Sequence, residues 1–334
     1  MASLDTLLAD RPWLLADGAT GTNLFAMGLE AGEAPELWNE TEPERIRALY
    51  DGAIGAGSDL FLTNSFGGNA SRLRLHEAED RVFALNRIAA EIARDAADAA
   101  GRPVAVAGSM GPTGEIMAPL GPLSLEAAAD MFEEQARGLI AGGADVLWVE
   151  TISAPDEYRA ASIGIARTGA PWVGTMSFDT AGRTMMGLTA ADMVMLVAEL
   201  PYPPLAFGAN CGVGASDLLR TVLGFSAAHP ALPVIAKGNA GIPKFADGHI
   251  HYDGTPELMA DYAVLARDCG ARIIGGCCGT TPAHLAAMRA ALETTPPGPV
   301  PDLGTIAARL GGFSSASDGS GVAPAGRERR RRRA

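Results

Sequence analysis

The sequence predicts an α/β protein built as a single (β/α)8 barrel, the TIM-barrel fold, with a basic tail after it. Eight short apolar runs of strand length recur along the 334 residues. Their ends lie roughly 25 to 45 residues apart, which leaves room for one helix in each interval. Three of the runs are near copies of one another, as expected for a repeated βα unit. No GxGxxG motif follows the first run, so an open dinucleotide-binding sheet is disfavoured.

Each predicted element has its own local signal. Several runs follow a glycine-containing turn of the helix C-cap type, and their last residues turn polar. The stretches 81–100 and 124–143 are amphipathic and predict helices between strands. Continuously apolar strands that alternate with helices indicate a parallel sheet covered on its outer face. In chain order the predicted strands lie within WLLADGATG (13–21), DLFLTNSF (59–66), PVAVAGSMG (103–111), DVLWVETI (145–152), PWVGTMSFD (171–179), LAFGANCG (205–212), PVIAKGNAG (233–241) and ARIIGGCC (271–278).

The composition divides the chain into three parts. We expect the barrel to span residues 1–293, a linker with a short helix to span 294–312, and a disordered Arg-rich tail to span 313–334. The formal net charge of −13 argues against nucleic-acid binding by the folded domain. No apolar run approaches the ~18 residues that a membrane span needs, and the start of the chain lacks the features of a signal peptide. The sequence therefore predicts a cytoplasmic protein, whose thiols stay reduced.

The cysteines carry the strongest chemical signal. Cys277 and Cys278 are adjacent, which makes them poor disulfide partners. They end the last predicted strand, and Cys211 ends the sixth, so a closed barrel should bring all three to one mouth. Three converging thiolates match a catalytic zinc site with three protein ligands and a fourth position for water or substrate. Cys269 is expected to be a buried core residue, and His284 to lie on a helix face rather than to bind the metal.

Several motifs resemble the homocysteine S-methyltransferase family. The resemblance runs from about Trp13 to Leu292, and the GGCCG motif with an upstream NC is its most specific part. Along its whole length the sequence looks most similar to bacterial betaine–homocysteine methyltransferases. The motifs that carry the likeness are LLADGATGTNL (14–24), TNSFGGN (63–69), VETI (149–152), GANCGVG (208–214) and IIGGCCGTTPAHLAAM (273–288).

The resemblance implies a function and a set of site residues. The function is zinc-dependent transfer of a methyl group to the thiol of homocysteine, giving methionine, with Cys211, Cys277 and Cys278 as the Zn²⁺ ligands. It also implies that Asp17, beside Gly18, and Glu150 hold the amino-acid part of homocysteine, with its ammonium between the two carboxylates. A turn or cap role for Asp17 and a rim ion pair for Glu150 are the structural alternatives. Further candidates for orienting ligands, for which turn chemistry is an equal explanation, are Asn64, Asn210 and Asn239.

The methyl donor is less clearly indicated by the sequence. Betaine carries a quaternary ammonium, which aromatic faces attract, and Trp38 matches a tryptophan of the betaine enzymes. Simple packing is the alternative role for that ring. The animal betaine enzyme has tyrosines after its second and fourth strands, where this chain has Gly67 and Thr151. The expected donor is betaine or a similar onium compound. The alternative is a homocysteine-binding subunit of a split methionine synthase that receives methyl groups from a cobalamin protein. A homo-oligomer is possible in either case.

Overall fold

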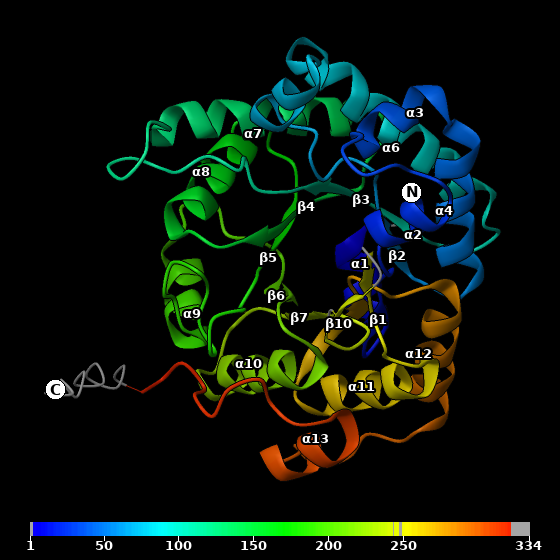
Figure 1. The fold of residues 1–334 in the computed structure, drawn as a ribbon, viewed down its shortest axis with the longest axis vertical. Coiled ribbons are helices and arrows are strands. Elements are labelled where there is room, and N and C mark those ends of the chain that lie inside the picture. Colours follow the sequence, from blue (N-terminus) through cyan, green and yellow to red (C-terminus); the bar gives the residue numbers. More distant parts are fainter. Residues whose placement is uncertain (1–2, 243, 247–248, 322–334) are drawn as a thin grey trace, which may run out of the picture.

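The barrel predicted from the sequence is confirmed. The computed structural model describes residues 3–242, 244–246 and 249–321, and Figure 1 looks down its eight parallel strands. The strands hydrogen-bond in the order β1-β10-β7-β6-β5-β4-β3-β2, and each lies in one of the eight predicted runs. Their bounds are β1 Leu14–Leu15, β2 Leu60–Leu62, β3 Ala105–Met110, β4 Val146–Ile152, β5 Trp172–Met176, β6 Phe207–Cys211, β7 Val234–Gly238 and β10 Ala271–Gly276.

One helix or helical stretch follows each strand and covers the outside of the sheet (Figure 1). The amphipathic stretches at 81–100 and 124–143 form two of these helices, and buried alanines on the first allow it to pack closely. The principal barrel helices are α4 Pro43–Gly55, α6 Val82–Ala99, α7 Leu125–Ala141, α8 Pro155–Ala166, α9 Ala190–Glu199, α10 Ala215–Ala227, α11 Pro256–Asp268 and α12 Pro282–Thr294.

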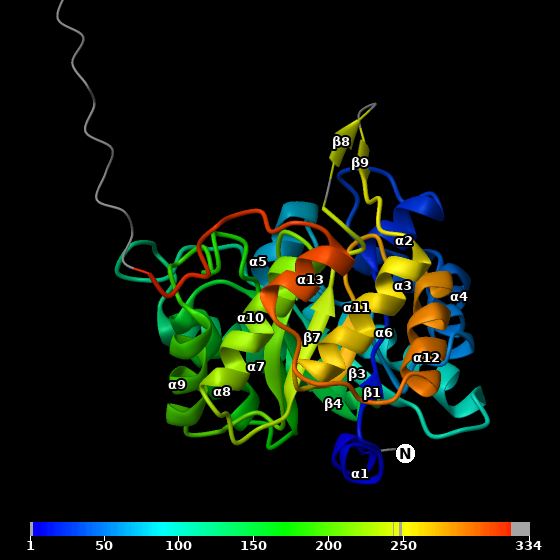
Figure 2. The same cartoon turned by 90° about the horizontal axis from the view of Figure 1, so that it is seen from below.

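Both faces of the strands are apolar, which explains their continuous hydrophobic runs. In β2, Leu60 and Leu62 belong to the cluster inside the barrel, whereas Phe61 packs into the larger cluster between sheet and helices. Leu4 and Leu7, from the helix α1 (Leu4–Asp10), join the inner cluster. This helix therefore covers the end of the barrel at which the strands begin (Figure 2).

The sheet closes through two aspartates rather than through a strand ladder. β1 and β2 end the strand order, and no ladder joins them within the described residues. At the start of β2 the amide N–H of Asp59 donates to the carbonyl of Leu15 at 2.6 Å, and the Asp59 carboxylate accepts the Leu15 N–H at 2.9 Å. At the other end, Asp17 Oδ2 accepts the Leu62 N–H at 2.8 Å. β1 is only two residues long, so the carboxylates of Asp59 and Asp17 supply the acceptors that join β1 to β2.

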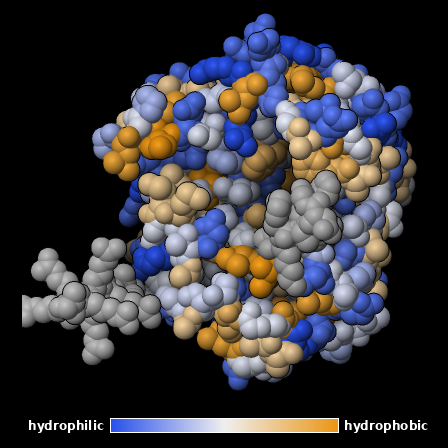
Figure 3. Space-filling view, in the orientation of Figure 1, coloured by the Kyte–Doolittle hydropathy of each residue, from blue (hydrophilic) through white to orange (hydrophobic). Residues whose placement is uncertain are grey.

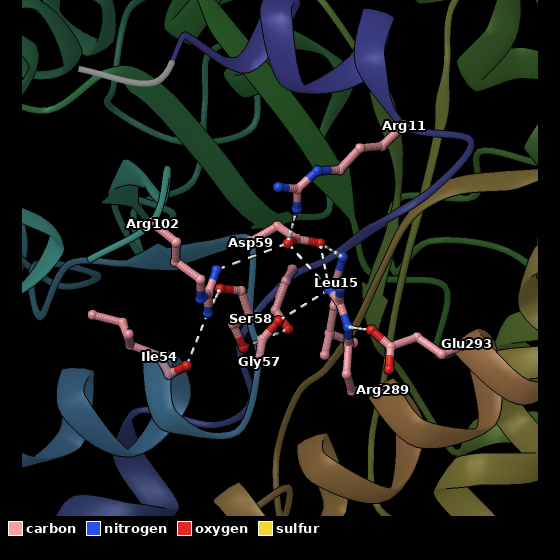
Figure 4. Close-up of polar contacts among 10 residues, drawn as sticks. Arg11, Leu15, Ile54, Gly57, Ser58, Asp59, Arg102, Arg289 and Glu293 are labelled. Atoms are coloured by element: carbon pink, nitrogen blue, oxygen red, sulfur yellow. Dashed lines mark hydrogen bonds and ion pairs between the residues drawn. The ribbon is translucent and has the colours of Figure 1, made fainter. Parts of the chain in front are cut away.

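Three arginines surround the Asp59 carboxylate at the junction of β1 and β2 (Figure 4). Its side chain is 1% exposed and forms ion pairs with Arg11 and Arg289, while Arg102 lies 3.9 Å away. These arginines come from the end of α1, from the turn after α6 and from α12, so one carboxylate joins three elements to β2.

Several smaller elements lie outside the repeating βα pattern. The antiparallel pair β8 (Lys244–Ala246) and β9 (His249–His251) follows β7 and projects from the end of the barrel opposite to α1 (Figure 2). The others are α2 Gly21–Ala26, η1 Pro35–Leu37, α3 Trp38–Thr41, α5 Ala70–Leu73, η2 Arg74–His76, η3 Glu79–Arg81 and α13 Leu303–Leu310. None of the described helices is both long and apolar enough to cross a membrane.

Residues 313–315 lie against α10, and Arg183 in the loop after β5 donates to the carbonyl of Gly321. The N–H of Ser314 donates to Asp217 at 2.9 Å, and Arg220 donates to the carbonyl of Ser315 at 2.8 Å and covers the ring of Phe313. The run of arginines that ends the predicted tail lies beyond residue 321, outside the described residues. The domain boundaries at 293 and 312 stay predictions.

Candidate metal and substrate site

Three cysteines converge at the ends of two strands. Cys211 is the last residue of β6, and Cys277 and Cys278 directly follow β10. Their Sγ atoms all lie within 4.8 Å of one another, and those of Cys211 and Cys278 are 3.9 Å apart. Cys269 does not belong to this group, because it caps the C-terminal end of α11 and is 1% exposed in the core.

The backbone holds the cysteines in place. Cys211 has a φ of 62°, in the left-handed region that side chains other than glycine rarely adopt. The N–H of Cys277 donates to Gly238 at the end of β7 at 2.7 Å. Asn239 joins the two cysteine loops, since its Oδ1 accepts from the N–H of Cys278 at 3.1 Å and its Nδ2 donates to the carbonyl of Gly212 at 2.9 Å. These contacts hold the backbone of both cysteine loops in position.

Asn210 connects the cysteines to β4. Its side chain is fully buried, and its Oδ1 accepts from the N–H of Thr151 at 2.9 Å and the hydroxyl of Thr175 at 2.7 Å. Its Nδ2 donates to the Thr151 hydroxyl at 2.7 Å and lies 3.7 Å from the Sγ of Cys277. The amide therefore orients protein groups on both sides of the mouth.

The sulfur positions fit a soft divalent metal ion. Four sulfurs placed tetrahedrally around Zn²⁺ at about 2.3 Å are about 3.8 Å apart, close to the separation between Cys211 and Cys278. Among the described residues the metal-binding group holds these three cysteines and no fourth ligand. His284 is committed elsewhere: its Nδ1 lies 2.8 Å from the Thr281 hydroxyl, in the capping box of α12, and its Nε2 lies 2.8 Å from the carbonyl of Gly254.

Asp17 has a cation of this chain as its partner. Its Oδ1 lies 2.6 Å from the Nζ of Lys237 on β7, and Oδ2 accepts the Leu62 N–H that helps to close the barrel. Asp17 and Lys237 are 6% and 2% exposed. Gly18 is required by the fold, because a Cβ there would lie 2.7 Å from the carbonyl oxygen of Thr280.

Glu150 is the carboxylate that has a free oxygen. It lies near the end of β4, is 8% exposed, and its Oε1 accepts the Ser109 hydroxyl at 2.5 Å. Within the described part of the chain no hydrogen bond to its Oε2 is found. Burial raises the pKa of Glu150 to about 7, against the lowering effect of the Lys237 charge. Glu150 therefore presents an acceptor oxygen that the described protein groups leave available.

The sequence of residues 14–292 matches the model of the homocysteine S-methyltransferase family, over the region that contains all of these groups. The chain belongs to the homocysteine S-methyltransferase family. The resemblance seen in its motifs is confirmed.

The chain is similar to long methionine synthases and to a methyltransferase of about its own length. The methionine synthase of Mycobacterium tuberculosis is 32% identical over 84% of this chain, and that of Mycobacterium leprae is 31% identical over 86%. The chain spans about a quarter of the length of these relatives. The metallated form of the homocysteine methyltransferase MmuM from Escherichia coli is similar over 86% of this chain and 99% of its own, with a TM-score of 0.71 and 28% identity.

Two of the predicted binding residues of this family member are engaged in packing. Trp38 is 7% exposed in the hydrophobic core, and the guanidinium of Arg45 covers its ring at 4.9 Å. The Nδ2 of Asn64 donates to the carbonyl of Pro35 and to Asn39, so it holds the loop after β1. These contacts supply structural roles, and ligand binding by either residue stays a prediction.

Sequence reasoning overlooked Lys237. Its signal was present: PVIAKGNAG places a lysine at the end of an otherwise apolar strand, where the neighbouring strands carry the cysteines. On the face of the molecule that contains the mouth, hydrophobic and hydrophilic residues are interspersed (Figure 3). Exposed apolar side chains on its loops include Ile116, Leu120, Met185 and Met186.

Proposed function

We propose that this protein is a zinc-dependent methyltransferase that transfers a methyl group from betaine, or a similar small onium compound, to the thiol of homocysteine and so produces methionine. The observation that carries the proposal is the group of three cysteine sulfurs, all within 4.8 Å, at the mouth of the barrel. Family membership and the likeness to MmuM, which has been solved in a metallated form, support it.

The proposed chemistry needs an ionised thiol. A free thiol has a pKa of about 8.5 and is mostly protonated at neutral pH. Zn²⁺ held by Cys211, Cys277 and Cys278 would supply the positive charge that keeps the homocysteine thiol ionised. A lone pair of the sulfur then forms the new S–CH₃ bond while the C–N bond of betaine breaks, and the electrons of that bond leave with the neutral tertiary amine. No general base is required for this step.

The contribution of Glu150 is to bind the ammonium of homocysteine. Its Oε2 is available, whereas both oxygens of Asp17 accept from groups of the protein. Ser109 holds the other oxygen of Glu150 at 2.5 Å, which fixes the carboxylate. A charge-assisted contact of this kind contributes about 1.5–3 kcal/mol. Glu150 therefore selects an amino thiol over thiols that lack the amino group.

Glu150→Gln should weaken homocysteine binding by about one to two powers of ten while zinc content stays unchanged. Only the ionised carboxylate attracts the ammonium, and burial places the pKa of Glu150 at about 7. Homocysteine affinity in the wild type should therefore rise as the pH increases through about 7. The variant should keep only the rise that ionisation of the homocysteine thiol produces, and should lack the added titration near pH 7. The measurement is kcat/KM for homocysteine from pH 5.5 to 8.5.

Glu157→Gln is the matched control. Glu157 is 5% exposed and binds Thr113 through one oxygen, which glutamine retains, so this variant should keep the wild-type pH profile. At saturating homocysteine the bound ammonium keeps Glu150 ionised, so kcat should show little dependence on the residue. If Glu150→Gln removes an ionisation from kcat and leaves homocysteine affinity unchanged, Glu150 is a general base instead.

Asn210→Asp should lower zinc affinity by about 10- to 100-fold, the usual cost of a change next to the ligands. The aspartate cannot donate toward Cys277 and places a negative charge near its thiolate, whereas the amide lies 3.7 Å from that sulfur as a donor. Competition with a chromogenic chelator measures the affinity. Wild-type affinity in this variant would show that the Asn210 amide has no influence on the metal.

A second candidate function is a homocysteine-binding subunit that receives its methyl group from a cobalamin protein. It is favoured by the methionine synthase relatives, of which this chain spans about a quarter. The match to 99% of the MmuM chain favours the stand-alone enzyme. Zinc-loaded protein incubated with homocysteine and betaine, a sulfonium donor or methylcobalamin separates the two. Methionine formed from the onium donors supports our proposal, and methionine formed only from methylcobalamin would replace it with the second candidate.

A further inference from the structure

Lys237 is a buried cation in the floor of the mouth. It is one of only two lysines among the 26 basic Lys and Arg residues of the chain, and its side chain is 2% exposed. Its Nζ has a 2.6 Å contact with Asp17 and lies 5.3 Å from the centre of the Trp148 ring. An ammonium is a compact point charge on a flexible stem, so it fits a space that a planar guanidinium would not fill.

The fold places this charge beneath the cysteines. In the sheet Lys237 is the register partner of Asn210 on β6 and of Gly275 on β10, so it lies between the two strands that end in the cysteines. A Cβ on Gly275 would lie 3.2 Å from the Cγ of Lys237, and the glycine thus makes room for the lysine stem. Burial lowers the pKa of Lys237, but the charges of Asp17, Glu150 and Cys277 outweigh it and raise the pKa above its ordinary value.

The proposed site carries an excess of negative charge, which a nearby cation offsets. A zinc ion with three thiolates has a formal charge of −1, and the substrate thiolate makes it −2. Asp17 and Glu150 add two carboxylates that are 6% and 8% exposed. Negative charges held close together away from water repel one another strongly. The substrate ammonium offsets one of them only while homocysteine is bound.

We propose that Lys237 is the resident counter-cation of the site, a positioning residue that offsets the negative charge of the loaded cysteine group and holds the Asp17 carboxylate in place. This inference rests on the proposed zinc-dependent function. Asp17 can still accept from the substrate ammonium, since an ionised carboxylate accepts more than one hydrogen bond at each oxygen.

Zinc affinity in three variants tests the inference, with a chromogenic chelator as competitor and circular dichroism as the check on folding. Lys237→Met should weaken zinc binding by about 10- to 100-fold. Asp17→Asn should keep or increase the affinity, because it removes a negative charge and leaves the lysine. The double variant should lie within a few-fold of the wild type. An ion pair with a purely structural role would instead lower zinc affinity in both single variants.

The possible failures can be told apart. Wild-type zinc affinity in folded Lys237→Met would overturn this inference and leave the proposed function standing, and so would equal losses in Lys237→Met and Asp17→Asn. Absence of zinc binding by the wild type would overturn both. If Lys237→Met does not fold, the comparison of Asp17→Asn with the double variant decides: the inference requires tighter zinc binding in Asp17→Asn, where the lysine remains.

Discussion

If the protein acts as proposed, replacing Cys277 by serine should give a folded barrel that no longer retains zinc and no longer transfers a methyl group to homocysteine. The three cysteine sulfurs are the complete metal-binding group of the described residues, so the variant keeps only two thiolates. Changes outside the ligand set already cost 10- to 100-fold in metal affinity, and loss of a ligand should exceed about 100-fold. Metal analysis after dialysis gives zinc per chain, and methionine formation gives the activity.

Cys269→Ser is the control for this experiment. Cys269 ends α11 and packs in the core, with 1% exposure. Its replacement should keep zinc and turnover, with a loss of about 1–3 kcal/mol in the free energy of unfolding from burial of a hydroxyl. Cys211→Ser and Cys278→Ser should behave like Cys277→Ser. Full zinc occupancy in any of these three variants would contradict the ligand assignment.

The barrel was predictable because its signals are local. Each strand is a run of apolar residues with glycine or polar residues after it, and the (β/α)8 arrangement follows from eight such runs with helices between them. The same reasoning placed Cys211, Cys277 and Cys278 at one mouth, because the ends of parallel strands meet there. The antiparallel pair β8 and β9 was not predicted, since it interrupts the repeating pattern between β7 and α11.

The partners of the charged residues were not predictable in the same way. The ion pair between Lys237 and Asp17 joins residues 220 positions apart, and it depends on the pairing of β1 with β10 and of β10 with β7. From the sequence, Asp17 and Glu150 looked like two equivalent carboxylates around a substrate ammonium. The structure shows Asp17 paired with Lys237, whereas Glu150 has an oxygen without a hydrogen bond among the described residues.

Asp59→Asn should lower the free energy of unfolding by about 2–4 kcal/mol without changing the zinc content of the folded protein. Asparagine keeps the shape of the side chain and an acceptor for the Leu15 N–H, but it removes the charge that Arg11, Arg102 and Arg289 share (Figure 4). The arginine side chains are 27–33% exposed, so water compensates part of the loss. Thermal unfolding should shift down by about 3–6 °C, because the unfolding entropy of a chain of this length is about 0.7 kcal/mol/K.

The location of Asp59 makes this prediction independent of the chemistry. Asp59 precedes β2, at the end of the barrel opposite to the cysteines. Its interactions join β1 to β2, between which the described residues form no strand ladder. Asp51→Asn is the matched control, because Asp51 forms an exposed ion pair with Arg47 on α4 that should contribute less than about 0.5 kcal/mol. Equal melting temperatures for the two variants would show that the strand ends hold this junction without the Asp59 charge. A loss of zinc from folded Asp59→Asn would instead mean that the junction transmits strain to the mouth, where Asp17 bridges the same pair of strands.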